Sequence, residues 1–152
     1  MLHDGDLDAL VSTLIPDLHR PDVSRLFPDF KAVERDYFER TGIFPVMHTV
    51  GLHADVHAEH PWVAEAVYEA MLEAKELALE RLYSNRALPV SLPWLLDHVE
   101  EARATFGEDY WPYGFETARP SLEALTRYSV EQGLSERKVQ PEELFVEALH
   151  AT

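Results

Sequence analysis

The stretch HPWVAEAVYEAMLEAKELALERLY, residues 60–83, decides what kind of fold this sequence can form. Apolar side chains recur along it at helical spacing, namely Val63, Val67, Met71, Ala74, Ala78 and Leu82. Glutamates at residues 65, 69, 73, 76 and 80 line the other side, which is typical of a helix with one solvated face. We therefore predict a helix from about Pro61 to Tyr83, because proline is tolerated in a first helical turn.

Prolines and glycines mark four further helices around this one. Proline begins or lies near the start of each, and Ser91 is a good N-cap residue for one of them. Glycine follows three of the segments, at residues 42, 107 and 133, where a left-handed conformation commonly ends a helix. The predicted segments are residues 28–41, 91–106, 120–132 and 141–149.

Residues 43–50, IFPVMHTV, are rich in β-branched and aromatic side chains and are predicted as a strand. Pro45 cannot donate to a sheet ladder, so this strand must lie at an edge or a crossover. A lone strand needs a neighbour, and residues 4–11 could supply a second short one. The fold class that we expect is α/β but mostly helical, with about five helices and one or two short strands.

The composition excludes two classes of partner. Asp and Glu number 28 against 13 Lys and Arg, so the 152 residues carry a formal net charge of -15. A field of that sign repels a phosphate backbone and an anionic membrane surface, so we expect neither nucleic acid nor membrane as a partner. The chain has no cysteine, no secretory signal pattern and no apolar run long enough to span a bilayer. We therefore expect a soluble, cytoplasmic protein.

Specific strings throughout the chain resemble the 4,5-dihydroxyphthalate decarboxylase family, which is similar to type II periplasmic solute-binding proteins. Family members are longer, so the resemblance implies that this chain is only the C-terminal half of a two-lobed protein. Residues 1–27 would end the second lobe and form the return connection, and residues 28–152 would form helices and the crossover strand. The strings are DGDLDAL (4–10), LFPDFKAVERDY (26–37), TGIFPVMHTV (41–50), HPWV (60–63), LPWL (92–95), YWPYG (110–114) and YSVEQGL (128–134).

The resemblance implies a carboxy-lyase that converts a small aromatic ortho-dicarboxylate to a dihydroxybenzoate without a cofactor. The alternative is a substrate-binding module of the ABC-transporter type, which captures a small carboxylate without turnover. Half of a cleft cannot close a pocket, so we expect the isolated chain to be inactive. We also expect it to form a homo-oligomer, because a half-fold leaves apolar faces exposed.

Decarboxylation of this kind needs cations for the carboxylates and an acid that protonates the ring carbon as carbon dioxide leaves. His48, on the predicted crossover strand, is the candidate catalytic acid because its pKa is ordinarily near neutral. The alternative is a histidine hydrogen-bonded to backbone at a strand edge. Arg40, together with Arg35, could clamp a carboxylate through its guanidinium fork, or could simply pair with acidic neighbours on the same helix.

Two other groups of side chains have both a functional and a structural interpretation. Tyr110 and Trp111 could stack on an aromatic substrate, or could pack the C-terminal helices together. His53 and His57 would share a helical face, as zinc ligands do, with His60 three residues further on. Because the residue before Pro61 avoids helical geometry and no third ligand is evident at a fixed spacing, we expect no metal.

Overall fold

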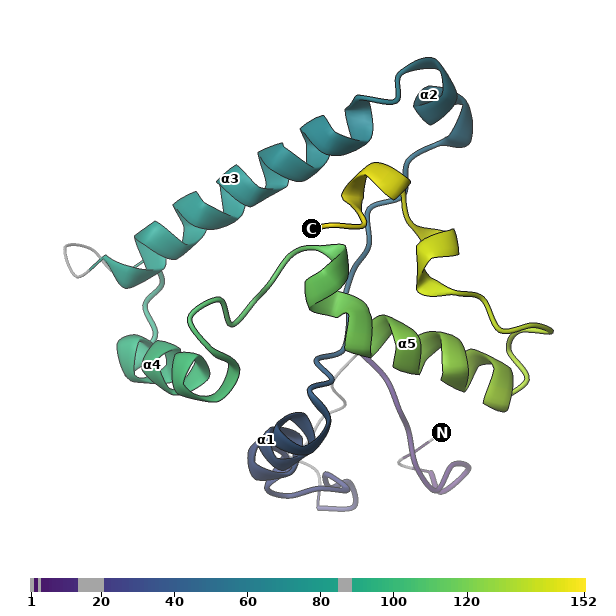
Figure 1. The fold of residues 1–152 in the computed structure, drawn as a ribbon. Coiled ribbons are helices and arrows are strands. Elements are labelled where there is room, and N and C mark those ends of the chain that lie inside the picture. Colours follow the sequence, from purple (N-terminus) through teal and green to yellow (C-terminus); the bar gives the residue numbers. More distant parts are fainter. Residues whose placement is uncertain (1, 3, 14–20, 85–88) are drawn as a thin grey trace. The chain divides into compact units, whose positions relative to one another are not determined.

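The structure is a computed structural model that describes residues 2, 4–13, 21–84 and 89–152. It divides into two compact units, residues 1–37 and 38–152. Within the described ranges the regular elements are five α-helices and two 3-10 helices, and none of these helices is long and apolar enough to cross a membrane (Figure 1). They are α1 (Phe30–Thr41), α2 (Ala54–Glu59), α3 (Val63–Tyr83), α4 (Leu95–Phe106), α5 (Phe115–Glu131), η1 (Pro141–Leu144) and η2 (Glu147–Leu149).

The mainly helical character is confirmed, and four of the predicted helices correspond to α1, α3, α4 and α5. Two of them start elsewhere than their prolines suggested. Helix α4 begins at Leu95, after Trp94 in a left-handed conformation (φ 57), so Ser91 is not its N-cap. Helix α5 begins at Phe115, five residues before Pro120. The earlier start is possible because Thr152 accepts hydrogen bonds from the amides of the first two helical residues.

The short helices differ from the prediction for local reasons. Residues 141–149 form η1 and η2 instead of one α-helix, because Phe145 and Val146 between them have extended backbones. Helix α2 was not predicted. It forms because the Nδ1 atom of His53 accepts a hydrogen bond from the Asp55 amide as an N-cap, and it ends before His60, which has a non-helical conformation ahead of Pro61.

The predicted strand at residues 43–50 is wrong for the part of the chain that the structure describes. Residues 42–53 are an irregular connection between α1 and α2, with no strand beside them in the described ranges. Residues 4–11 are exposed, begin with a turn in which the Gly5 amide donates to the Leu2 carbonyl, and form no strand either. Extended backbone becomes a strand only when a neighbour pairs with it, so β-type composition alone was insufficient.

The core of residues 38–152 is small and lies on α3, α4 and α5. Phe115 and Leu122 of α5 are its most buried apolar side chains, each 3% exposed. Large apolar side chains elsewhere stay in contact with solvent, including Trp94 at 77% and Leu134 at 78% exposed. The buried apolar residues on the three helices are Ala64, Leu95, Val99, Phe115, Leu122 and Ala124.

The last residues of the chain close over the start of α5. The amide of Glu116 donates to the main-chain oxygen of Thr152 at 2.6 Å, and the amide of Phe115 donates to the Thr152 hydroxyl at 3.1 Å. The Phe115 ring stacks on His150 with 4.9 Å between the ring centres. Gly114 makes this closure possible, since a Cβ there would lie 2.7 Å from the carbonyl carbon of Thr152.

Candidate functional site

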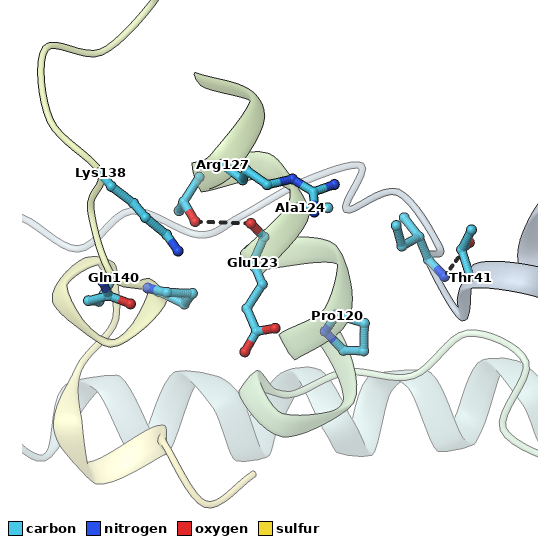
Figure 2. Close-up of a pocket in the computed structure, with 10 residues that line it drawn as sticks. Thr41, Pro120, Glu123, Ala124, Arg127, Lys138 and Gln140 are labelled. Carbon is cyan, nitrogen blue, oxygen red and sulfur yellow. Dashed lines mark hydrogen bonds between the residues drawn. The ribbon is translucent and has the colours of Figure 1, made fainter. Parts of the chain in front are cut away.

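A depression of about 520 Å³ lies within residues 38–152, where three parts of the chain meet (Figure 2). The first is the end of α1 with the start of the connection 42–53, the second is one face of α5, and the third is the segment that leads into η1. Four apolar side chains contribute to its lining, namely Ile43, Pro120, Ala124 and Pro141. Its polar residues are Thr41, Glu123, Thr126, Arg127, Lys138 and Gln140.

Helical geometry and one chain reversal assemble this lining. Pro120, Ala124 and Arg127 are spaced four and three residues apart, so they share one face of α5. The helix ends near Gly133, which has a left-handed backbone (φ 71), and the chain then returns so that η1 packs against α5. The return brings Lys138 to the face that carries Arg127.

The charges around the depression favour an anion. The Arg127 guanidinium lies 4.8 Å from the centre of the Tyr128 ring and 3.6 Å from a carboxylate oxygen of Glu131, and it is about half exposed. The Lys138 ammonium makes no ion pair with any residue of the described ranges. The one acidic side chain of the lining, Glu123, approaches Arg119 to 4.0 Å, and Figure 2 shows it extending away from the Arg127 guanidinium.

Arg119 holds the two sides of the depression together. Its guanidinium donates to Glu116 at 2.6 Å and 3.0 Å on its own helix, and to Glu142 of η1 at 2.5 Å. Hydrogen bonds from Arg119 lower the pKa of both carboxyl groups, and the same bonds raise the pKa of Arg119. The fully charged cluster therefore fixes η1, and with it Gln140 and Pro141, against α5.

A cluster of aromatic rings supports the connection 42–53 next to the depression. The Phe44 ring meets Trp111 and Phe106 edge to face, with 5.3 Å between ring centres in both pairs. Phe106 in turn contacts Phe38 at 4.7 Å. The backbone of Phe44 is bonded to Ser121 of α5 through its amide and its carbonyl. The start of the connection is therefore held by both side-chain and main-chain contacts.

None of the four residues predicted from sequence lines the depression. His48 is exposed on the connection 42–53, four residues after Phe44, and Arg40 is exposed in the last turn of α1. Trp111 packs against Phe44, whereas Tyr110 turns to Tyr83. Burial and a hydrogen bond with Tyr83 raise the pKa of Tyr110. The roles assigned to these four residues remain predictions.

Arg127, Lys138 and Gln140 were missed by the sequence argument. Arg127 belongs to a predicted helix, but its spacing from the other two residues matches no binding motif. Only the return of the chain after Gly133 shows that they line one depression. For the histidines, the described ranges contain no group of three or more His, Cys, Asp or Glu side chains that could hold a metal.

Comparison with known proteins shows what the chain is similar to. The chain is similar to a protein of Comamonas testosteroni named 4,5-dihydroxyphthalate decarboxylase, with 34% identity over 148 residues. The match covers 95% of this chain but 45% of the relative, so the chain spans less than half of the relative's length. The matched part is a C-terminal portion of that protein. No family model matches the chain.

Proposed function

Because the chain belongs to the 4,5-dihydroxyphthalate decarboxylase family over the part that it spans, we propose that it supplies one wall of the active site of an aromatic ortho-dicarboxylate decarboxylase. The observation that carries this proposal is the 34% identity, which extends over 95% of the chain rather than over one motif. The depression on α5 supports it independently, because its lining suits a flat ring that bears anionic groups.

The depression offers complementary groups for each part of such a substrate. Its apolar residues provide a surface for the ring, and the cations Arg127 and Lys138 of the lining are available to bind its carboxylates. The amide of Gln140 can hydrogen-bond a ring hydroxyl. Since hydrogen bonds between charged groups are stronger than neutral ones, the two cations should contribute most of the affinity.

The reaction balances without a redox cofactor. A hydroxyl group para to the leaving carboxylate donates electron density to the ring carbon, which accepts a proton. The bond between that carbon and the carboxylate then breaks, its electron pair returns to the ring, and carbon dioxide leaves. The net change is one proton consumed and one carbon dioxide released per 3,4-dihydroxybenzoate formed. His48 is the proposed proton donor, since histidine is the side chain that most often transfers protons in catalysis.

Because the chain spans 45% of the relative's length, we propose that polypeptide beyond these residues completes the site. We propose that the added polypeptide completes a two-lobed, type II solute-binding-like fold. Two observations support this proposal: the exposure of Val46, Met47 and Val50, and the relative's greater length. In that fold the added polypeptide would cover the exposed connection 42–53, from which His48 would donate its proton.

Binding of phthalate tests the substrate class with the chain as it stands. We expect phthalate, with two carboxylates, to bind more tightly than benzoate in a calorimetric titration. Arg127→Gln and Lys138→Gln should each lower the affinity for phthalate by about tenfold and remove the preference for phthalate over benzoate. Arg137→Gln is the matched control, because Arg137 adjoins Lys138 but is paired with Glu143 at 2.8 Å. Equal affinities for the two ligands, or an equal loss in the control, would refute the assignment.

Turnover tests the reaction with the protein as its gene encodes it. We expect 4,5-dihydroxyphthalate to yield carbon dioxide and 3,4-dihydroxybenzoate in equal amounts. His48→Ala should lower kcat by about a hundredfold, the usual contribution of a positioned acid, while phthalate binding is retained. Binding without any release of carbon dioxide would overturn the decarboxylase proposal and assign a solute-binding module instead.

A further inference from the structure

One buried hydroxyl joins the connection 42–53 to α5. The Ser121 side chain, in a residue that is 8% exposed, accepts a hydrogen bond from the Phe44 amide at 3.1 Å. The same hydroxyl donates to the Phe44 carbonyl at 2.6 Å. It thus satisfies both main-chain groups of one residue, as a neighbouring strand would, although the two residues are 77 positions apart.

The two residues that this hydroxyl joins both adjoin the depression. Ile43 precedes Phe44 and Pro120 precedes Ser121, and both belong to the apolar lining. His48 follows Phe44 by four residues on the same connection. The bond between Ser121 and Phe44 therefore sets the distance between the two sides of the depression and fixes the point from which the segment with His48 departs.

We propose that Ser121 is a positioning residue of the site, acting through the backbone of Phe44. This inference rests on the proposed function, because it assigns Ser121 to the depression that binds the dicarboxylate. Ser121 touches no reacting atom in this scheme. Its role is to hold the connection against α5 so that Ile43 completes the ring-binding surface and His48 meets the substrate at a defined place.

Loss of the hydroxyl should loosen the connection without unfolding the chain. Alanine is a better helix former than serine, so α5 keeps its own hydrogen bonds in Ser121→Ala. The Phe44 ring also keeps its contacts with Phe106 and Trp111. The main-chain groups of Phe44 lose their only partner in the described ranges, so the effect should be confined to the connection.

Three variants separate positioning from a general structural role. Ser121→Ala removes the hydroxyl, and Ser121→Thr keeps it. Ser129→Ala is the matched control, because the Ser129 hydroxyl on the same helix donates locally to the Leu125 carbonyl at 2.9 Å. Amide hydrogen exchange at Phe44 reports the bond itself, phthalate affinity reports the depression, and kcat of the gene product reports the placement of His48.

For Ser121→Ala we expect exchange at Phe44 to accelerate by about tenfold, while amides of α5 keep their protection. Phthalate affinity and kcat should fall by at least about fivefold, with both retained in Ser121→Thr and in Ser129→Ala. Faster exchange at Phe44 with unchanged affinity and kcat would overturn the positioning role while leaving the proposed function intact. If the unaltered protein does not bind phthalate, the proposed function fails, and the inference about the site fails with it.

Discussion

Replacement of Gly114 by alanine is the most direct test of how the C-terminal residues secure α5. Gly114 precedes the helix with φ 128 and ψ 164, a conformation that is essentially restricted to glycine. A Cβ at this position would lie 2.7 Å from the carbonyl carbon of Thr152 and 3.0 Å from its oxygen. Both neighbours are main-chain atoms, so no side-chain rotation can relieve the contact.

The expected loss of stability has two parts. Alanine in this conformation costs about 2 kcal/mol in backbone strain. Displacement of Thr152 also breaks its bonds with the amides of Phe115 and Glu116, at about 1 kcal/mol each. We therefore expect Gly114→Ala to lower the free energy of unfolding by about 4 kcal/mol. For a unit of this size, that loss corresponds to a fall in Tm of about 17 °C.

Gly133→Ala provides the matched control for backbone strain alone. Gly133 is also left-handed, with φ 71, but no atom lies within 4 Å of the position that a Cβ would take. It should cost only about 1 kcal/mol. Urea denaturation followed by circular dichroism measures both variants. Equal losses in the two, or a loss below about 1 kcal/mol in Gly114→Ala, would show that Thr152 does not close over α5 as described.

Two further predictions concern charged groups. The Lys75 side chain is 12% exposed, and its ammonium lies 2.7 Å from both carboxylate oxygens of Asp109. Lys75→Met should therefore lower the free energy of unfolding, measured by urea denaturation, by about 1.5 kcal/mol. No change would contradict an anchoring role for the pair. Hydrogen bonds from Arg119 lower the pKa of Glu116 and Glu142, so the folded chain binds fewer protons than the unfolded one. The resulting stability is complete above the ordinary carboxyl pKa of 4.5 and is lost as the pH falls below it. Urea midpoints measured between about pH 6 and about pH 3 should fall more steeply for the unaltered protein than for Arg119→Gln, and parallel curves would argue against the cluster.

The sequence predicted the elements whose signals are local. Helices α1, α3, α4 and α5 follow from apolar side chains that recur every three or four residues, which is a property of the segment itself. The residues at which α4 and α5 begin could not be predicted from the sequence. Trp94 has a left-handed backbone that its residue type disfavours, and the start of α5 depends on Thr152, far along the chain.

The strand prediction shows the limit of composition as a guide. Residues 43–50 have the side chains of a strand, yet within the described ranges only Phe44 of this segment has both main-chain groups bonded, and its partner is a serine hydroxyl. Strand formation requires a second segment, so the free energy of forming a strand is not a property of residues 43–50 alone.

For the candidate site, residue chemistry suggested His48 and Arg40 as the groups to examine, while the two cations that line the depression are Arg127 and Lys138. The sequence by itself determined the family, the acidic charge and most of the helices, because each depends on residue identity or on contacts within about one turn. Tertiary structure alone decided that Lys138 returns to Arg127 and that Ser121 holds Phe44. Ser121 and Phe44 are 77 positions apart, and Lys138 reaches the depression only after the chain reverses at Gly133, so both arrangements form only when the chain packs.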